Sequence, residues 1–214
     1  MVSRRTFLQD LGRGVILVVS YPVLGTDLLH AAQLEPTPPS TEGPYYTPGA
    51  PAKNNLREKG DSATALRVSG SLVDIRDVPI SGGLIEIWHT DPSGRYDLDG
   101  FRYRSAIRTT PQGAYDFETF MPANYGGRPR HIHYKITADG FKPLVTQLYF
   151  ENDPFFEDRL DQTIRKDPLV RYRELIRPVV PFRSGQSVSV NFKICLAGNA
   201  TRNAKIFLES PLYF

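Results

Sequence analysis

Two histidines separated by one residue, His131 and His133, are the side chains whose type and spacing most directly suggest chemistry in this 214-residue chain. Polar and apolar residues alternate over 131–137, which is the period-2 pattern of a half-buried strand. On a strand, residues i and i+2 point to the same face, with their Cα atoms roughly 6.5–7 Å apart. Two imidazoles at that separation can bind one zinc, copper, iron or nickel ion. From the pair alone, two ordinary, partly exposed strand histidines fit equally well.

Two tyrosines next to turns could complete such a site. Tyr96 follows residues 93–95 and Tyr125 follows residues 122–124, whereas no carboxylate or thiol is as well placed for a ferrous or zinc site. A phenol ionises near pH 10, and only a strongly Lewis-acidic ion lowers that pKa far enough to give a phenolate at neutral pH. Ferric iron is such an ion, with a preference for hard anionic oxygen.

Short strand-like stretches separated by turn residues are the elements that must position these side chains. The chain is 40% hydrophobic and 23% charged, and its 18 prolines and 17 glycines favour strands joined by turns over a helical bundle. We expect strands over 66–73, 84–89, 101–109, 114–120, 131–137, 144–150 and 188–194, a hairpin connection at 111–113, and a short helix within 152–172. We therefore predict an all-β fold, a β-sandwich of mostly antiparallel strands with long loops and at most short helices.

Residues 3–9 look like a twin-arginine export signal, and the apolar run 15–24 after them is too short for a convincing membrane span. The alternative is an amphipathic helix with two chance arginines. We predict a signal segment over 1–32, an extended Pro-rich linker and N-terminal arm over 33–63, and a β-sandwich domain over 64–214. The signal predicts export to the periplasm, or another extracytoplasmic location, through the twin-arginine translocase, with membrane anchoring if the segment stays uncleaved.

Charge and cysteine usage exclude two further classes of protein. The formal net charge of +3 is too small to argue for nucleic acid, and Arg4, Arg5 and Arg13 alone account for it. A single cysteine, Cys195, excludes an internal disulfide framework. Because it lies in an apolar strand-like run, we expect Cys195 to be a small buried hydrophobe.

The N-terminal arm carries two adjacent tyrosines, Tyr45 and Tyr46, in a proline-punctuated stretch that cannot form a helix. Two interpretations fit them: their rings pack across the body of the domain, or they line the mouth of a site.

Four motifs in order give the chain a family resemblance. They are EGPYY at 42–46, EIWHTDPSGRY at 86–96, RPRHIH at 128–133 and TQLYF at 146–150. With them, residues 41–196 resemble the intradiol ring-cleavage dioxygenases, the non-haem Fe(III) family that includes protocatechuate and catechol dioxygenases. The resemblance implies insertion of both atoms of O2 into a catechol-type aromatic diol, with cleavage between the two hydroxylated carbons to a muconate-type diacid.

The resemblance also implies roles for particular residues. One Fe(III) per chain would be bound by Tyr96, Tyr125, His131 and His133. Arg128 would stabilise negative charge that develops on the substrate ring, since a guanidinium stays charged throughout. Gln147 and Tyr125 join Arg128 as implied catalytic residues, and the implied substrate-binding residues are Tyr45, Tyr46, Trp88 and Arg128. The partners would be the diol, O2 and, for a homo-oligomer, further copies of the chain, with 64–214 as the catalytic domain.

Two departures and two other functions stand beside this resemblance. Arg130 occupies a position that is usually small in the family, and the link from Tyr125 to Arg128 is only two glycines long. We expect His89 to be a satisfied strand-end histidine and not a fifth ligand. The alternatives of other classes are a non-catalytic β-sandwich binding module and a metal-dependent hydrolase, for instance a zinc enzyme that uses the His131–His133 pair.

Overall fold

The computed structural model describes residues 33–60, 62–156, 167–183 and 187–199, so the predicted signal segment lies outside the described residues. Two five-stranded sheets make up the fold, and the only helical elements in these ranges are the 3-10 turns η1 (Pro154–Phe156) and η2 (Arg173–Leu175). The predicted all-β sandwich is confirmed. No helix in the described part of the chain is long and apolar enough to span a membrane.

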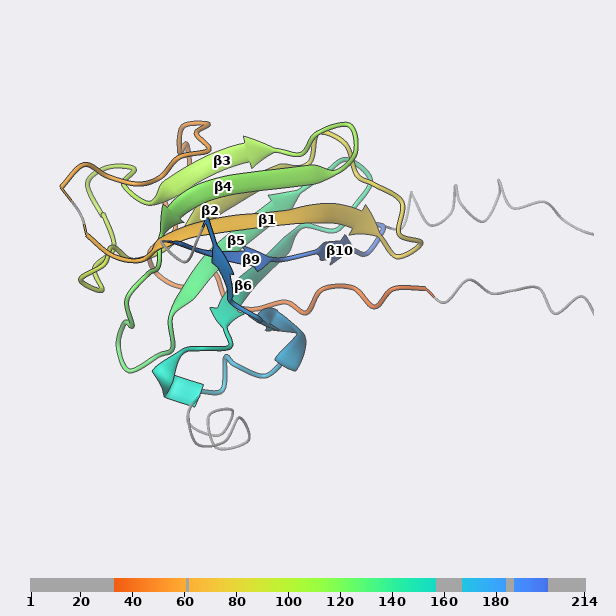
Figure 1. The fold of residues 1–214 in the computed structure, drawn as a ribbon. Coiled ribbons are helices and arrows are strands. Elements are labelled where there is room, and N and C mark those ends of the chain that lie inside the picture. Colours follow the sequence, from red (N-terminus) through yellow and green to blue (C-terminus); the bar gives the residue numbers. More distant parts are fainter. Residues whose placement is uncertain (1–32, 61, 157–166, 184–186, 200–214) are drawn as a thin grey trace, which may run out of the picture. The chain divides into compact units, whose positions relative to one another are not determined.

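The first sheet is built around the longest strand, β1 (Ala65–Asp74). One edge of β1 pairs in parallel with β9 (Ser187–Asn191) and then β10 (Ile194–Leu196), and its other edge pairs antiparallel with β4 (Ala114–Phe120). A short strand, β8 (Val180–Phe182), extends the sheet beyond β9. Figure 1 shows these strands as one layer, with β5 and β6 of the other sheet crossing behind them.

The second sheet has the order β3-β2-β5-β6-β7. Its strands are β3 (Arg104–Arg108), β2 (Leu84–Trp88), β5 (His131–Thr137), β6 (Leu144–Phe150) and β7 (Ile176–Arg177). Alternation explains how β5 is placed: Ile132, Tyr134 and Ile136 are fully buried in the core between the sheets. His131 and His133 therefore point to the opposite face of this sheet, which we call the site face.

The predicted strands all form, but two details are wrong. The predicted hairpin connection at 111–113 is not a hairpin, because β3 belongs to the second sheet while β4 pairs with β1 in the first. The predicted strand 188–194 is interrupted after Asn191, where the Phe192 carbonyl accepts a hydrogen bond of 2.6 Å from Tyr115 Oη and so leaves the strand ladder. A Cβ on the facing Gly70 would lie 2.0 Å from that carbonyl oxygen, so only glycine permits the approach.

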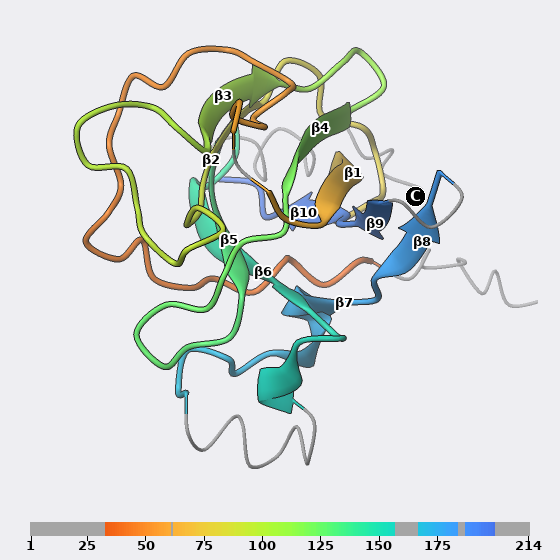
Figure 2. The ribbon, with the colours of Figure 1, turned by 60° about the vertical axis from the view of Figure 1, so that its left-hand side comes forward.

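The N-terminal arm lies against the second sheet. Ser40 N donates to the Val145 carbonyl of β6 over 2.8 Å, and Thr146 Oγ1 donates to the Pro38 carbonyl over 2.8 Å. Figure 2 shows the arm, in orange, passing β6 and β5 before it turns toward β3. The arm thus covers the face on which the two histidines lie.

Candidate metal centre

A row of buried side chains crosses the site face at the level of His133. The strand register places Arg104 beside Trp88, Trp88 beside His133, and His133 beside Gln147. All four are at most 3% exposed. The Trp88 indole stacks on the His133 imidazole, with ring centroids 4.8 Å apart and planes 8° from parallel. Contacts within the sheet thus fix one face of the His133 ring.

Three of the four predicted ligands bring their donor atoms together. Tyr96 Oη lies 3.3 Å from His131 Nε2 and 3.1 Å from His133 Nε2, and the two Nε2 atoms are 3.2 Å apart. Metal–nitrogen bonds are about 2.0–2.1 Å long, so two donors on one ion at about 95–110° lie roughly 3.0–3.4 Å apart. The three observed separations all fall within that interval.

The tautomers of the histidines test whether a cation fits. His131 Nδ1 lies 2.7 Å from the Pro129 carbonyl oxygen, so Nδ1 carries the proton and Nε2 the lone pair. His133 donates a ring N–H to the Thr41 backbone carbonyl. Because its Nε2 faces His131 and Tyr96, the nitrogen that donates to Thr41 is Nδ1, which gives the same tautomer. Two lone pairs then point at one place, together with a phenol that has a single proton. A hard cation satisfies all three atoms, and the donors fit ferric iron.

Burial keeps both imidazoles neutral, as metal ligands must be. Burial, and then the charge of Arg128, lowers the pKa of His131 to about 4. Burial also lowers the pKa of His133 well below its ordinary value, followed by the effects of His131 and Arg128. Burial raises the pKa of Tyr96 above its ordinary value, so this phenol needs a strong Lewis acid to ionise at neutral pH. No group of three or more His, Cys, Asp or Glu in the described ranges could hold a metal, so a metal bound by His131 and His133 would need a ligand of another type.

Tyr125, the fourth predicted ligand, lies beside this cluster. Its ring is 5.5 Å from that of Tyr96, and its hydroxyl contacts the hydroxyl of Tyr45 from the arm. The Tyr45 ring in turn stacks on Tyr96, with centroids 4.4 Å apart. Of the two arm interpretations, Tyr45 follows the one that places it at the site.

Three other predicted site residues are Tyr46, Trp88 and Gln147. Tyr46 donates a hydrogen bond of 2.9 Å to Glu86 and lies under the ammonium of Lys135, so it anchors the arm to the sheet. Trp88 is 1% exposed, and its rings face His133 and Tyr46. The Gln147 amide nitrogen lies 3.3 Å from His133 Nδ1 and also donates to the Thr41 carbonyl over 2.9 Å. Substrate contact by Tyr46 and Trp88 stays a prediction.

Arg128 is held beside the donor atoms by several groups. Its Nη2 donates to Gln147 Oε1 over 2.9 Å and to Tyr149 Oη over 2.7 Å, and its Nε donates to Asp167 over 2.9 Å. Its Nη1 lies 3.4 Å from His131 Nε2. The guanidinium is therefore fixed next to the three donor atoms, with Nη1 on the side of His131.

Sequence reasoning missed three residues of this arrangement. Tyr149 could have been found, because it lies two residues after Gln147 on the same predicted strand and so shares its face. Asp167 follows Arg128 by 39 residues in a stretch without periodicity, and nothing in the sequence marks it. Arg104 is 2% exposed and donates over 2.8 Å to the carbonyl of Asp97, the residue after Tyr96. It holds the loop that carries this ligand.

Arg130 and His89 lie outside the donor cluster. The Arg130 side chain is 30% exposed and its Nε is 4.0 Å from the buried Asp153 carboxylate. His89 is 1% exposed, with Nδ1 2.7 Å from the Thr90 carbonyl and Nε2 2.9 Å from Thr119 Oγ1. His89 is thus a satisfied strand-end histidine, as predicted.

The buried His89 predicts a pH dependence of stability. Burial, together with the nearby Arg104 charge, lowers its pKa from 6.5 to about 4, although a hydrogen bond to Thr90 opposes the shift. As the pH falls from about 6.5 to about 4, the unfolded chain takes up a proton that the folded chain does not. Stability should therefore fall by up to about 3 kcal/mol over this window. Denaturant unfolding of wild type and His89→Gln isolates this contribution as the difference between two pH profiles; parallel profiles would contradict it.

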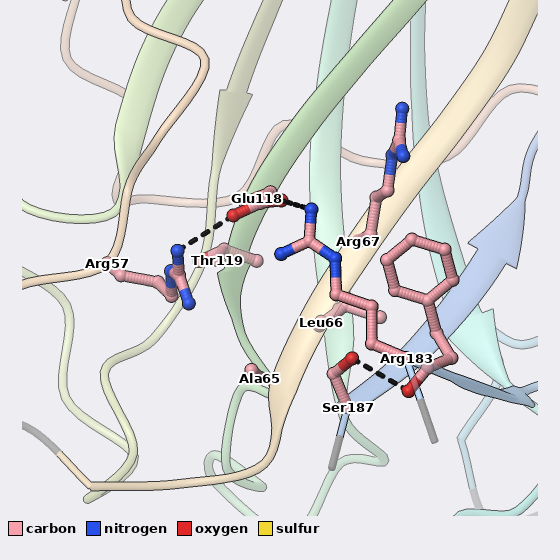
Figure 3. A pocket seen from close by; sticks show the side chains of 9 residues that line it. Arg57, Ala65, Leu66, Arg67, Glu118, Thr119, Arg183 and Ser187 are labelled. Carbon is pink, nitrogen blue, oxygen red and sulfur yellow. Dashed lines mark hydrogen bonds and ion pairs between the residues drawn. The ribbon is translucent and has the colours of Figure 1, made fainter. Parts of the chain in front are cut away.

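A small depression on the first sheet does not belong to the centre. Figure 3 shows Glu118 between Arg57 and Arg183. Glu118 accepts a hydrogen bond of 2.8 Å from Arg57 and forms an ion pair of 3.2 Å with Arg183. Arg67 pairs with Asp116 over 3.2 Å, and its guanidinium lies over the ring of Phe182. Each of these three guanidiniums has a carboxylate partner, so the cluster is a surface ion-pair network of modest energy.

Comparison with known proteins agrees with the fold. A family model described as dioxygenase matches residues 41–198, from the arm to just beyond β10. Chlorocatechol 1,2-dioxygenase of Rhodococcus opacus is 30% identical over 193 residues, which cover 73% of this chain and 71% of that protein. Catechol 1,2-dioxygenase 2 of Acinetobacter lwoffii is 30% identical over 167 residues, covering 65% and 61%.

A similar solved structure is the dioxygenase domain of a dioxygenase and carbohydrate-binding protein fusion from Streptomyces sp. SirexAA-E. It superposes with a TM-score of 0.67 at 32% identity and covers 77% of this chain and 100% of that domain.

Proposed function

This chain belongs to the intradiol ring-cleavage dioxygenase family, and on that premise we propose that it inserts both atoms of O2 into a catechol-type diol at a non-haem ferric centre. Its enzyme class is that of the ring-cleaving oxidoreductases. Cleavage between the two hydroxylated carbons gives a muconate-type diacid, and both oxygen atoms of O2 end in that product.

One observation carries this proposal. Tyr96 Oη and the Nε2 atoms of His131 and His133 converge with separations of 3.1–3.3 Å, and a phenol oxygen among them favours a ferric ion over a zinc ion. Tyr125 is the fourth ligand in the proposal, since its ring lies beside that of Tyr96. The arm then covers the centre through Tyr45 and Thr41.

Bound ferric iron would supply the Lewis acidity that holds a catechol as its dianion and makes its ring reactive toward O2. The chain supplies the rest. As a tyrosinate on the ion, Tyr125 Oη would accept one of the two protons that the diol loses, and solvent would take the other. The adjacent Tyr45 hydroxyl is in hydrogen-bond contact with Tyr125 Oη. Arg128 Nη1 stabilises the negative charge on the ring without giving up a proton. Trp88 and Gln147 keep His133 in orientation.

Iron loading and oxygen consumption test the proposal together. Protein reconstituted with ferric iron should bind about one ion per chain, absorb visible light through tyrosinate-to-iron charge transfer, and consume one O2 per diol. Catechol, protocatechuate, hydroxyquinol and chlorocatechol form the substrate panel, and a 1,3-diol, which cannot chelate, is the negative control. A colourless protein that consumes no O2 with any of these diols overturns the proposal. Zinc-loaded protein that hydrolyses esters would support the hydrolase alternative.

We also propose that residues 1–32 direct export through the twin-arginine translocase, on the basis of Arg4 and Arg5 in their sequence context. A reporter protein fused after residue 32 should reach the periplasm, and changing both arginines to lysine should stop it. Equal export of the two fusions would contradict this. Homo-oligomer formation stays a prediction that sedimentation can decide.

A further inference from the structure

Among the residues that the structure describes, the guanidinium of Arg128 has one ionic partner, and that partner is not part of the predicted donor set. Asp167 Oδ2 accepts a hydrogen bond of 2.9 Å from Arg128 Nε. The side chains are 19% and 7% exposed, so the ion pair is largely removed from water. In such surroundings, loss of one partner leaves a poorly solvated charge, and the remaining group reorients or draws in water.

Both the carboxylate and the backbone carbonyl of Asp167 accept hydrogen bonds from residues just after it. Its Oδ1 accepts a hydrogen bond of 3.0 Å from Leu169 N, and its carbonyl accepts one of 3.0 Å from Val170 N. Val170 is fully buried in the hydrophobic core. The carboxylate is thus a rigid support and not a mobile surface group.

The contacts of Arg128 leave only one edge of the guanidinium for chemistry. Asp167 takes Nε, while Gln147 Oε1 and Tyr149 Oη accept from Nη2. What remains is Nη1, which lies 3.4 Å from His131 Nε2. A guanidinium is a planar fork, so the group that holds Nε determines the direction in which Nη1 points.

We propose that Asp167 is a positioning residue of this centre: it orients Arg128 so that Nη1 faces the ring of a bound diol. The inference rests on the proposed function and deepens it. Asp167 touches none of the donor atoms, so it acts on the step in which charge develops on the ring and not on metal binding.

Asp167→Asn tests this with little change of shape. The iron content, the visible spectrum and the dissociation constant of the diol measured without O2 should stay within about threefold of wild type. The kcat should fall about 10–100-fold, as with other partners that orient active groups. Asp74→Asn is the matched control, because Asp74 is also buried and pairs with an arginine, Arg76, at 3.0 Å, but belongs to the first sheet. The control should leave kcat within about threefold.

A double-mutant cycle on the iron-free protein gives a readout that does not depend on catalysis. Unfolding midpoints of Asp167→Asn, Arg128→Met and the double variant should show that the second change costs much less once the first is present. If Asp167→Asn alone does not fold, the double variant, which has no unpaired buried charge, should recover folding. Additive effects, or a kcat in Asp167→Asn equal to that of the Asp74 control, overturn the inference. If wild type neither binds iron nor cleaves a diol, the proposed function fails, and the cycle still decides whether Asp167 holds Arg128.

Discussion

Replacing His133 with glutamine should abolish iron binding, the visible colour and ring cleavage together. The imidazole is stacked on Trp88, and its Nε2 lies 3.1 Å from Tyr96 Oη and 3.2 Å from His131 Nε2. A glutamine amide is a far weaker ligand and cannot occupy that stacked position. Loss of a residue that only orients a ligand costs about 10–100-fold, so loss of the ligand itself should reduce activity at least about 1,000-fold. Iron per chain, the visible spectrum and O2 uptake measure the three effects.

His89→Gln is the matched control for this change. Both histidines are buried, but the ring nitrogens of His89 bond to Thr90 and Thr119 and lie outside the donor cluster. The control should lose stability and keep its iron. If His133→Gln retained as much iron as His89→Gln, the assignment of His133 as a ligand would be wrong.

Arg128→Met is expected to separate iron binding from turnover. Methionine removes the charge next to the centre while it leaves all four proposed ligands in place, so iron and colour should remain. By analogy with the removal of one donor from an oxyanion hole, kcat should fall about 100–1,000-fold. The buried Asp167 would lose its partner, which should destabilise the fold by about 3 kcal/mol, or lower Tm by about 6–12 °C. Steady-state oxygen uptake and thermal unfolding provide the two measurements.

The neighbouring Arg130 supplies a comparison at nearly the same place in the chain. Its side chain is 30% exposed and its nearest carboxylate, on Asp153, lies 4.0 Å away. Arg130→Met should therefore change stability by less than about 1 kcal/mol and leave kcat within about threefold. A kcat in Arg128→Met no lower than in Arg130→Met would remove Arg128 from the chemistry.

Alternation along single strands was enough to predict most of the sandwich. The predicted strands 114–120, 131–137 and 144–150 agree with β4, β5 and β6 at both ends. The first two alternate polar and apolar residues, and the third is a short run rich in apolar and β-branched residues that follows a turn. The predicted hairpin connection at 111–113 was wrong for a physical reason. A turn signal reports that the chain reverses, but not whether the next strand pairs with the previous one or joins the opposite sheet.

The candidate centre was predictable where its residues lie on or beside patterned strands. His131 and His133 share a face by their spacing, and the His133 ring is then fixed by its cross-strand neighbour Trp88. Asp167 has no such spacing to reveal it, because its contact with Arg128 exists only after an irregular segment folds back. The tautomer of His133 depends likewise on its contact with the Thr41 backbone. Thr41 also accepts a hydrogen bond from Gln147, which lies 106 residues later in the chain.

The hydrogen bonds of the arm have a consequence for the order of folding. Cys195 N donates to Thr37 Oγ1 over 2.8 Å, a contact that joins residues 158 positions apart. During synthesis, the arm emerges first and cannot find this partner until nearly the whole sandwich has been made. Closing so long a loop is entropically unfavourable until the intervening strands have formed. The start of the arm is therefore fixed only after β5 and β6 have formed, so the sheet that carries the two histidines precedes the fully docked arm on the folding pathway. A metal ion that arrives in that interval meets the donors before the arm covers them.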